Sequence, residues 1–403
     1  MNDYLLADDL SGALEAGAAF RQQGRRVKLT WDVANEPQAE NVFKVVSTES
    51  RNLPTTEAAA TIRKVLTRQR AHGGKLCFKK IDSTLRGPVG AELRVLIEAL
   101  APSLVVLCPA NPQAGRTLSD GILKVNGVPL AETDFREDPI WPMQTSDVAE
   151  LLRGQGATVS RCRLSIDDWR DKGNAAAATI SEALKHPAEV LLADAETQAD
   201  VEALVKVVRQ HAPGAILVGS GALAAALAAE MIDSAPEQPQ PRPNLKPMLL
   251  LCGSRHPASR RQFEHLARES GGEVIVAAVD DLNISTLCDK SASALATRGI
   301  AAVRFTLSGN ETPEDARRLL LRIQEVTPSL LARTHPASLF LTGGETAWTV
   351  CQALQATEVE ILEELAPGVV LSLLTTASGD PLPIVTKPGG FGGEALLSDC
   401  LSI

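Results

Sequence analysis

The sequence predicts an α/β protein with two domains, each a largely parallel sheet flanked by helices. Short apolar runs alternate with segments of helical periodicity along most of the chain, which is typical of strands joined by crossover helices. A chain of 403 residues is expected to form two hydrophobic cores rather than one. Residues 233–247 hold five prolines and few apolar side chains, which indicates a linker. We therefore expect domains at residues 1–232 and 248–403.

The composition excludes several classes of protein. The net charge of −9 disfavours a general nucleic-acid-binding role, and an aromatic content of 3% argues against stacking platforms for bases. The seven cysteines are scattered and lie mostly in apolar runs, so we expect reduced, buried thiols rather than disulfides or metal ligands. We find neither a signal peptide nor an apolar run of about 18 residues, and we expect a cytoplasmic protein without a membrane partner. A homodimer is compatible with this composition, which leaves the oligomeric state open.

Residues 79–94 contain a concentrated polar cluster, with six polar side chains in the eight positions 79–86. Its polar side chains are Lys79, Lys80, Asp82, Ser83, Thr84 and Arg86. A strand is expected at about 76–81, and a helix is expected to begin with Gly87 as its cap and Pro88 as its first residue. The cluster therefore lies at a strand-to-helix turn, where a positive helix N-terminus suits a carboxylate or a phosphate. The alternative is a solvated rim with helix-capping side chains.

A pair of carboxylates follows the first predicted strand. Residues 4–7 form a short apolar run that leads directly into Asp8 and Asp9, and Ser11 is expected to cap the next helix. Adjacent carboxylates at the carboxyl end of a strand are a recurrent place for chemistry in open α/β sheets. The alternative is an acidic first turn that complements the helix dipole.

Two further strand ends in the first domain carry cations. The strand expected at 42–46 runs into a polar segment that ends with Arg51. The strand expected at 103–108 runs into residues 109–117, which are too rich in proline and glycine for regular structure. Arg116 in that segment is a candidate second cation for an acidic ligand.

Three glycine-containing turns follow predicted strands in the second domain. They are Cys252-Gly253-Ser254, Thr342 to Thr346, and Lys387 to Glu394. Glycine lets the backbone approach a phosphate, and helix N-termini supply aimed N–H donors, so three such turns favour a nucleotide site. The chain has neither a P-loop motif nor a dinucleotide-binding fingerprint, which disfavours P-loop enzymes and NAD-dependent oxidoreductases. The six histidines show no metal-ligand spacing, so no metal site is predicted, and the role of His256 stays open.

Taken together, these segments resemble the four-carbon acid sugar kinases, which phosphorylate D-threonate, D-erythronate or 3-oxo-tetronate with ATP. Any one segment is weakly specific, but all of them in this order are highly specific, and they cover nearly the whole chain. The matching blocks are Ala7 to Ala13, Thr48 to Arg51, Lys79 to Gly87, Gly115 to Thr117 with Asp120-Gly121, Asn126 to Leu130, Gly219 to Gly221, Cys252 to Ser254, Gly343 to Thr346, and Lys387 to Gly392.

The resemblance implies an N-terminal acid-sugar-binding domain, a C-terminal nucleotide-binding domain and a reaction in the cleft between them. The implied substrate contacts are Asp9, Arg51, Lys80, Asp82, Ser83 and Thr84, to which local charge adds Arg86 and Arg116. The implied ATP contacts are Ser254, Gly343, Gly344, Glu345, Thr346, Gly389 and Gly390. Many relatives carry Gly-Ser-x-Ser-Pro where this chain has Arg255-His256-Pro257, and some carry Lys-Ser-Gly-Asn-Phe-Gly where it has residues 387–392. The second departure favours threonate or erythronate over 3-oxo-tetronate.

We therefore hypothesise that the γ-phosphoryl group of ATP is transferred to the terminal (4-) hydroxyl of a four-carbon sugar acid. Arg51, Lys80 and the turn at 83–84 would bind the substrate carboxylate. A carboxylate must orient the attacking hydroxyl and accept its proton, and Asp82 and Asp9 are both candidates. Mg²⁺ would neutralise the phosphates, with ligands that the sequence leaves open, as it does the stereoisomer of the acid. A 3-oxo-tetronate kinase and a non-catalytic regulator that binds sugar acid and nucleotide are the alternatives.

Overall fold

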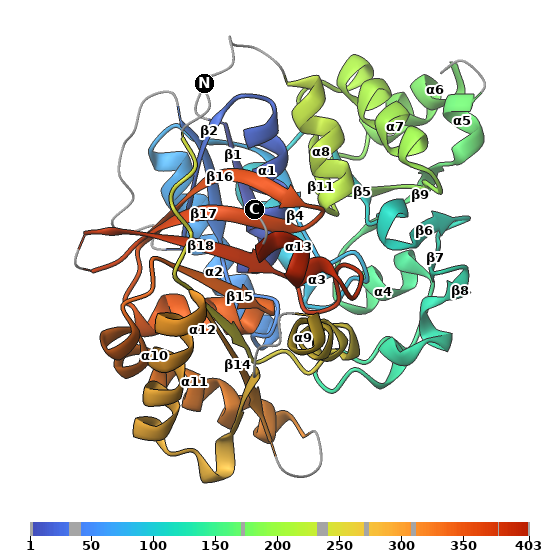
Figure 1. Cartoon of the computed structure of the whole chain (residues 1–403). Helices are drawn as coiled ribbons and strands as arrows, with labels where there is room; N and C mark the ends of the chain where they lie inside the picture. The colour runs from blue at the N-terminus through green and yellow to red at the C-terminus, as the bar shows by residue number, and fades with distance from the viewer. Residues whose placement is uncertain are drawn as a thin grey trace. The chain divides into compact units, whose positions relative to one another are not determined.

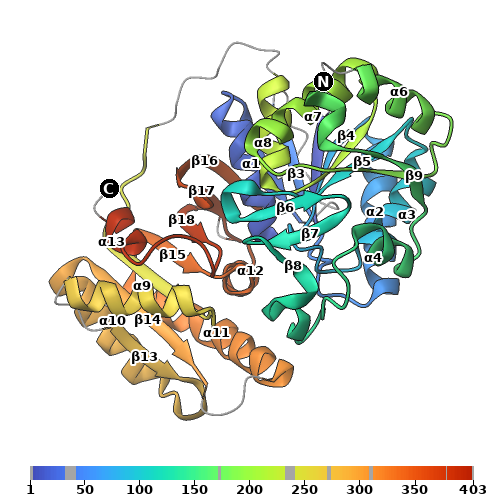
Figure 2. The same cartoon turned by 90° about the vertical axis from the view of Figure 1, so that its right-hand side faces the viewer.

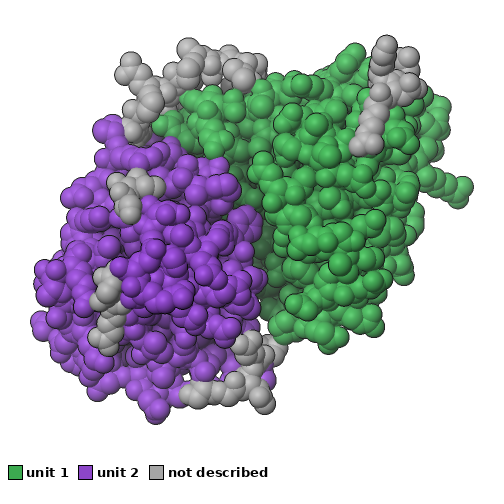
Figure 3. Space-filling model, turned by 45° about the vertical axis from the view of Figure 1, so that its right-hand side comes forward, with its two compact units in different colours: residues 1–237 green, residues 238–403 purple. Residues whose placement is uncertain are grey.

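The chain divides into two compact units, residues 1–237 (unit 1) and 238–403 (unit 2), which Figure 3 distinguishes by colour. The computed structural model describes residues 3–31, 42–170, 174–231, 241–269, 274–307, 312–377 and 379–401. Residues 233–240 of the expected linker lie outside the described ranges. All seven cysteines are free thiols, and five of them are buried.

Unit 1 is built on a parallel sheet with the strand order β2-β3-β1-β4-β11-β5-β10-β9 (Figure 1). The strands are β1 (Asp3–Ala7), β2 (Arg26–Thr30), β3 (Val42–Ser47), β4 (Lys75–Lys80), β5 (Val105–Cys108), β9 (Val159–Leu164), β10 (Val190–Ala193) and β11 (Ile216–Gly219). The helices are α1 (Leu10–Gln22), α2 (Thr55–Ala71), α3 (Val89–Leu100), α4 (Val148–Gly154), α5 (Ile166–Arg170), α6 (Asn174–Ala183), α7 (Gln198–His211) and α8 (Gly221–Glu230). A small antiparallel sheet of β6 (Arg116–Ser119), β7 (Ile122–Val125) and β8 (Val128–Pro129) follows β5.

Helices cover both faces of this sheet, so the central strands are apolar on both sides. On one face, Leu6 of β1 belongs to the same core cluster as Ile62 of α2 and Leu93 of α3. Leu5 is equally buried, and because neighbouring side chains of a strand alternate, it faces the opposite side. There α1 contacts α8, and α8 contacts α7 (Figures 1 and 2).

The order of the strands predicts where unit 1 binds a ligand. From the central β1, the chain moves outward through β2 and β3 on one side and then crosses to β4 on the other. Ligands of open α/β sheets bind outside the carboxyl ends of the strands where the order reverses in this way. That position lies at the ends of β1, β3 and β4, where the polar clusters were predicted.

Unit 2 repeats the arrangement with a mixed sheet in the order β13-β14-β12-β15-β18-β17-β16. The strands are β12 (Met248–Cys252), β13 (Val274–Ala278), β14 (Ile300–Thr306), β15 (Ser338–Thr342), β16 (Glu358–Ala366), β17 (Val369–Thr375) and β18 (Pro381–Lys387). The helices are α9 (Pro257–Glu269), α10 (Ile284–Arg298), α11 (Pro313–Thr334), α12 (Gly344–Ala353) and α13 (Leu396–Leu401). From the central β12 the chain again moves first to β13 and β14 and then crosses to β15, which places a second reversal at the ends of β12 and β15.

The predicted fold class is confirmed, and several predicted details are wrong. Helix α1 begins at Leu10 because the Asp9 carboxylate, not the Ser11 hydroxyl, accepts the capping hydrogen bond, from the Gly12 N–H at 2.8 Å. Helix α3 begins after Pro88, which is itself the N-cap, rather than after Gly87.

Three further differences concern elements that the sequence analysis shortened or left out. The segment 109–117, expected to be irregular, contains a 3₁₀ turn at Pro112–Ala114 and the start of β6. The alternation of strands and helices in the sequence predicts a helix at about 312–326, but the observed helix α11 continues through Pro328 to Thr334, where its buried face still packs. The antiparallel strands β16 and β17, which pair with β18, were not predicted.

Candidate functional site

Backbone hydrogen bonds bring three polar strand ends of unit 1 together. The N–H of Thr48, after β3, donates to the carbonyl of Ala7 in β1 at 2.9 Å. The N–H groups of Ser50 and Arg51 both donate to the carbonyl of Asp8, at 2.9 and 3.2 Å. On the other side, β1 pairs with β4 up to Lys80. The side chains that follow β1, β3 and β4 therefore form one cluster, which we call the acid cluster: Asp8, Asp9, Glu49, Arg51, Lys80, Asp82, Ser83, Thr84 and Arg86. We add Arg116, the first residue of β6, because the charges of Asp82 and Arg86 act on its guanidinium.

Arg51 bridges the two aspartates that follow β1. Its guanidinium donates to Asp8 at 3.0 and 2.8 Å and to Asp9 at 2.6 and 2.7 Å. Burial raises the pKa of Asp8, but the charges of Arg51 and Lys79 outweigh it, so the pKa lies below its ordinary value. Burial also raises the pKa of Asp9, Arg51 lowers it and the adjacent Asp8 charge raises it again, so the net pKa shift is upward. The two neighbouring carboxylates therefore differ in proton affinity.

The two lysines at the end of β4 have different surroundings. Lys79 is 1% exposed and forms an ion pair with the buried Glu92 at 2.8 Å, so its charge is already compensated and it is not a free cation for a ligand. Lys80 pairs with Glu15 of α1 at 3.1 Å. A Cβ added at Gly12 would lie 2.7 Å from Asp9 Oδ1 and 3.0 Å from Lys80 Nζ, so glycine is needed where α1 approaches these groups.

Asp82 is held by the residues that follow it. Its carboxylate accepts from Arg86 Nε at 2.9 Å and Nη2 at 3.2 Å and from the Thr84 hydroxyl. Arg86 also lies 3.5 Å from Asp138. Burial raises the pKa of Asp82, but the charges of Arg86 and Arg51 outweigh it and hold the pKa well below its usual range. Asp82 is therefore a firmly ionised carboxylate and a weak proton acceptor.

Arg116 differs from the other cations of the acid cluster. In the part of the chain that the structure describes, it forms no ion pair, and its buried Nε has no hydrogen-bond partner. Its Nη1 donates only to the nearby carbonyl of Ala114. Burial lowers the pKa of Arg116, the charge of Asp82 raises it and that of Arg86 lowers it, so its guanidinium lies within electrostatic range of both groups. Among the described residues of the cluster, it is the cation whose guanidinium has no carboxylate partner.

Glu49 is a member of the cluster that the sequence analysis named only within a motif. It adopts a φ of 48°, a left-handed conformation that is uncommon for a residue other than glycine. Its carboxyl group accepts a hydrogen bond from the Ser47 hydroxyl. Burial and the charge of Asp9 raise the pKa of Glu49 to about 8. Its position directly before Ser50 and Arg51, in a polar run after a strand, was the available sequence signal.

The predicted nucleotide-binding residues of unit 2 also lie together. A Cβ added at Gly389, after β18, would lie 2.2 Å from the Ser254 hydroxyl oxygen, and one at Gly343, after β15, would lie 3.2 Å from Ser254 Cβ. The Thr346 hydroxyl accepts from the N–H of Gly253 at 3.2 Å. Gly343 has a φ of 102°, which only glycine adopts readily, and it is the N-cap of α12, whose first turn contains Gly344 and the exposed Glu345.

His256 borders this second site. A Cβ added at Gly390 would lie 3.1 Å from His256 Nε2, and His256 Nδ1 accepts from the N–H of Ala258 at 3.1 Å. The imidazole therefore satisfies a donor in the first turn of α9 and lines the glycine turn after β18.

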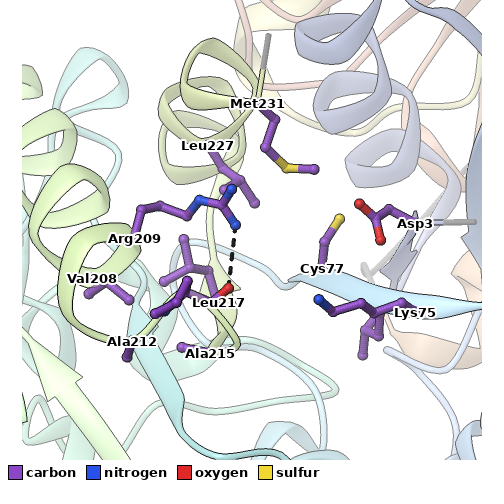
Figure 4. A pocket seen from close by; sticks show the side chains of 12 residues that line it. Asp3, Lys75, Cys77, Val208, Arg209, Ala212, Ala215, Leu217, Leu227 and Met231 are labelled. Atoms are coloured by element: carbon purple, nitrogen blue, oxygen red, sulfur yellow. Dashed lines mark hydrogen bonds between the residues drawn. The ribbon is translucent and has the colours of Figure 1, made fainter. Parts of the chain in front are cut away.

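A cavity of about 220 Å³ lies elsewhere in unit 1, at the amino ends of β1, β4 and β11 (Figure 4). Its polar lining includes Asp3, Lys75, Cys77 and Arg209, and Leu227 and Met231 close its apolar side. Burial, together with the Asp3 charge, raises the pKa of the Cys77 thiol to about 12, so this thiol is not a reactive nucleophile. The cavity lies at the amino ends of the strands, whereas the acid cluster lies at their carboxyl ends, so we do not include the cavity in the site.

Two features are absent from the residues that the structure describes. No group of three or more His, Cys, Asp or Glu side chains is arranged to hold a metal ion. None of the helices combines the length and the apolar character needed to cross a membrane.

Comparison with known proteins identifies one known domain type for each of the two units. A family model described as a sugar-binding N-terminal domain matches residues 4–227, and one described as a nucleotide-binding C-terminal domain matches residues 249–397. A protein named D-threonate kinase from Salmonella typhimurium is 30% identical over 100% of this chain and 98% of its own length. A D-threonate kinase from Cupriavidus necator is 32% identical (98% and 96% covered), and a D-erythronate kinase from Heliobacterium modesticaldum is 26% identical (99% and 96% covered).

Two solved structures share the fold. A crystal structure from Salmonella typhimurium LT2 superposes with a TM-score of 0.81 at 24% identity, over 99% of both chains. A Bordetella bronchiseptica protein, crystallised with bound citrate as a domain-swapped dimer, gives a TM-score of 0.50 at 29% identity, over 99% of this chain and 98% of that one.

The fold and the family models thus define a protein with a sugar-binding and a nucleotide-binding domain. The chain belongs to the four-carbon acid sugar kinase family, whose curated members include D-threonate, D-erythronate and 3-oxo-tetronate kinases. The resemblance found in the sequence is confirmed.

Proposed function

We propose that this protein is an ATP-dependent kinase that phosphorylates the terminal (4-) hydroxyl of a four-carbon sugar acid such as D-threonate or D-erythronate. One observation carries the proposal: a chain that aligns from end to end with a D-threonate kinase has an acid cluster in one unit and a glycine-rich nucleotide site in the other. Both clusters lie at the strand-order reversal of their own sheet, where ligands of such folds bind.

We assign the substrate carboxylate to Arg116 rather than to Arg51 and Lys80. Arg51 already makes four hydrogen bonds to Asp8 and Asp9, which leaves about one of its five N–H donors free. Lys80 is paired with Glu15. Arg116 has a buried Nε without a partner, and a guanidinium can bind a carboxylate through two parallel hydrogen bonds. Arg51 and Lys80 then serve to fix the aspartates and helix α1 around the substrate.

We assign the proton acceptor to Asp9. An efficient general base needs a proton affinity closer to neutrality than that of an ordinary carboxylate. The pKa of Asp9 is raised, mainly by burial, whereas that of Asp82 is held well below its usual range because Arg86 and Arg51 outweigh burial. The substrate hydroxyl would attack the γ-phosphorus, the bond from that phosphorus to the bridging oxygen of ADP would break, and the hydroxyl proton would pass to Asp9. Asp82, with Ser83 and Thr84, would orient the substrate hydroxyls.

We assign the ATP phosphates to the glycine turns of unit 2. The N-terminus of the ten-residue helix α12 and the turn at Gly389 and Gly390 both present backbone N–H groups beside Ser254. Mg²⁺ would enter with ATP and neutralise the phosphates. Magnesium usually keeps several waters and binds through phosphates and one or two carboxylates.

ADP release by the purified protein with Mg-ATP tests this function. The acids to compare are D-threonate, L-threonate, D-erythronate, L-erythronate and 3-oxo-tetronate, and we expect turnover on D-threonate or D-erythronate. Turnover only on 3-oxo-tetronate would confirm the kinase activity but contradict the proposed substrate. Nucleotide binding without turnover on any acid would favour a regulator. Light scattering would determine the oligomeric state, which the sequence leaves open; the domain-swapped dimer of the Bordetella bronchiseptica relative favours a homodimer.

A further inference from the structure

The glycine loop, residues 388–393, has its carbonyl groups turned toward a buried ammonium. Lys387, the last residue of β18, donates from Nζ to the carbonyl oxygens of Pro388 at 2.8 Å, Gly389 at 3.3 Å and Phe391 at 3.4 Å. A single side chain therefore donates hydrogen bonds to three carbonyl groups of one short loop. No strand or helix contains these residues, so Lys387 replaces the regular backbone pairing that the loop lacks.

Two neutral side chains of α9 complete this inward set. The Ser259 hydroxyl donates to the carbonyl of Gly389 at 2.7 Å. The Gln262 side-chain amide lies 2.9 to 3.0 Å from the carbonyl oxygens of residues 391–393. Both side chains are fully buried.

Most carbonyl groups of the loop are bonded by these side chains, whereas most of its N–H groups are unpaired in the described part of the chain. Among the described residues, the backbone N–H groups of Gly389, Gly390, Gly392 and Gly393 have no hydrogen-bond partner. Gly390, Gly392 and Gly393 are exposed. Unpaired N–H groups on an exposed glycine backbone are the donors that an anion-binding loop uses.

Lys387 is an unusual residue to find in this position. Its side chain is 1% exposed, and within the described ranges it forms no ion pair with a carboxylate. Burying an uncompensated charge is costly, so a sequence that keeps one needs a reason other than packing. Three carbonyl acceptors match the three N–H donors of an ammonium, whereas a neutral amine has one donor fewer.

We propose that Lys387 is a positioning residue that holds the glycine loop in its phosphate-binding conformation and places a fixed positive charge behind the unpaired N–H groups. The proposal rests on the proposed function, because it takes the phosphates of ATP as the anion. Lys387 itself does not touch the nucleotide; it acts through the backbone that it folds and through its charge. The loop differs in this respect from a P-loop, whose lysine reaches the phosphates directly.

The surroundings of Lys387 make its charge sensitive to pH. Burial lowers the pKa of Lys387 to about 8. The titratable groups that act on it are the thiols of Cys252, at the end of β12, and Cys400, in α13. Burial raises the pKa of Cys252 to about 11 and also raises that of Cys400, so both thiols are neutral at pH 8. Above pH 8 Lys387 therefore loses its proton with no compensating change nearby, and the loop loses a donor and its charge.

Binding of Mg-ADP to the full-length protein, measured by calorimetry between pH 7 and 9.5, tests the proposal. For the wild-type protein we expect the dissociation constant to rise about tenfold as pH passes through 8. Lys387→Met, which keeps the length of the side chain, should bind Mg-ADP at least tenfold more weakly at pH 7 and show no step near pH 8. In turnover, its KM for ATP should rise while its KM for the sugar acid stays within twofold.

A matched control is Lys290→Met, which removes an exposed lysine from α10 of the same unit and should bind as the wild-type protein does. Lys387→Arg keeps a charge that does not titrate in this range, so its affinity should not step at pH 8. If Lys387→Met does not fold, the wild-type pH profile and Lys387→Arg still decide the question. Wild-type binding that is tight and flat across this range, or unchanged binding by folded Lys387→Met, would overturn the positioning role alone. Absence of any Mg-ADP binding by the wild-type protein would overturn the proposed function as well.

Discussion

The two candidate sites occupy equivalent positions in two related sheets, yet they are built from different groups. The acid cluster of unit 1 consists of charged side chains in a network of ion pairs, with Arg51 bridging Asp8 and Asp9 and Arg86 holding Asp82. The nucleotide site of unit 2 consists mainly of glycine backbone and hydroxyl groups, and the charge of Lys387 is buried among the carbonyl groups of the glycine loop.

The difference reflects what each ligand requires. A four-carbon acid offers a carboxylate and several hydroxyls whose arrangement must be distinguished, which needs directional side chains held in fixed positions. Phosphates present similar oxygens in every nucleotide, so unpaired N–H groups suffice. The acid cluster should therefore fail when a side chain is removed, whereas the nucleotide site should fail when a side chain is added.

Asp9→Asn is the substitution with the largest expected effect. Asparagine caps a helix as well as aspartate, so α1 should keep its N-cap, but it cannot accept the hydroxyl proton. We expect kcat to fall by about 10²- to 10⁴-fold, with the KM for ATP within about threefold of wild type. Steady-state kinetics on the preferred acid measures both constants.

Asp147→Asn is the control for Asp9→Asn. Asp147 caps α4 through the N–H of Glu150 at 3.0 Å, and it belongs to neither site, so kcat should not change. A loss of kcat below fivefold in Asp9→Asn would contradict the assignment of Asp9 and transfer the role of proton acceptor to Asp82.

The sequence predicted which segments meet in the acid cluster, but not how its charges pair. Segments at the ends of parallel strands converge because the topology requires it, and this was readable from the alternation of strands and helices. The pairing of Arg51 with Asp8 and Asp9 joins residues more than 40 positions apart and depends on the three-dimensional register of β1 and β3. Lys79 shows the same limit, because its partner Glu92 lies on the buried face of α3 and removes it from the site.

Arg116→Gln should have the next largest effect, and this effect should be confined to binding of the sugar acid. The substitution removes the cluster's unpaired guanidinium, so the KM for the sugar acid should rise about 10- to 100-fold while the KM for ATP stays unchanged. Arg116→Lys should fall between the two proteins, because it keeps the charge and loses the fork. Arg94→Gln, at an exposed position on α3, is the control. An unchanged KM for the acid in Arg116→Gln would contradict this assignment and indicate that Arg51 and Lys80 bind the substrate carboxylate.

The glycine turns of unit 2 could be predicted from the sequence, but the role of Lys387 in supporting one of them could not. Glycines after predicted strands mark places where the backbone must come close to something, and Gly343 and Gly389 both do so beside Ser254. In the sequence, Lys387 was noted only as the first residue of a glycine turn and of a block that matches the family. Its burial and its three carbonyl partners follow from the packing of α9 and α13 around the end of β18, which no local pattern encodes.

Gly389→Ala is the smallest of the three changes, because it adds one methyl group and removes nothing. The new Cβ would lie 2.2 Å from Ser254 Oγ, so the loop or Ser254 must move. Overpacking of this kind costs about 1–3 kcal/mol, and we expect the KM for ATP to rise about tenfold while the KM for the acid stays constant. Gly154→Ala, where an added Cβ meets nothing within 4 Å, is the control. Wild-type ATP affinity in Gly389→Ala would show that this turn does not contact the nucleotide, and the contrast between a side-chain site and a backbone site would then rest on α12 alone.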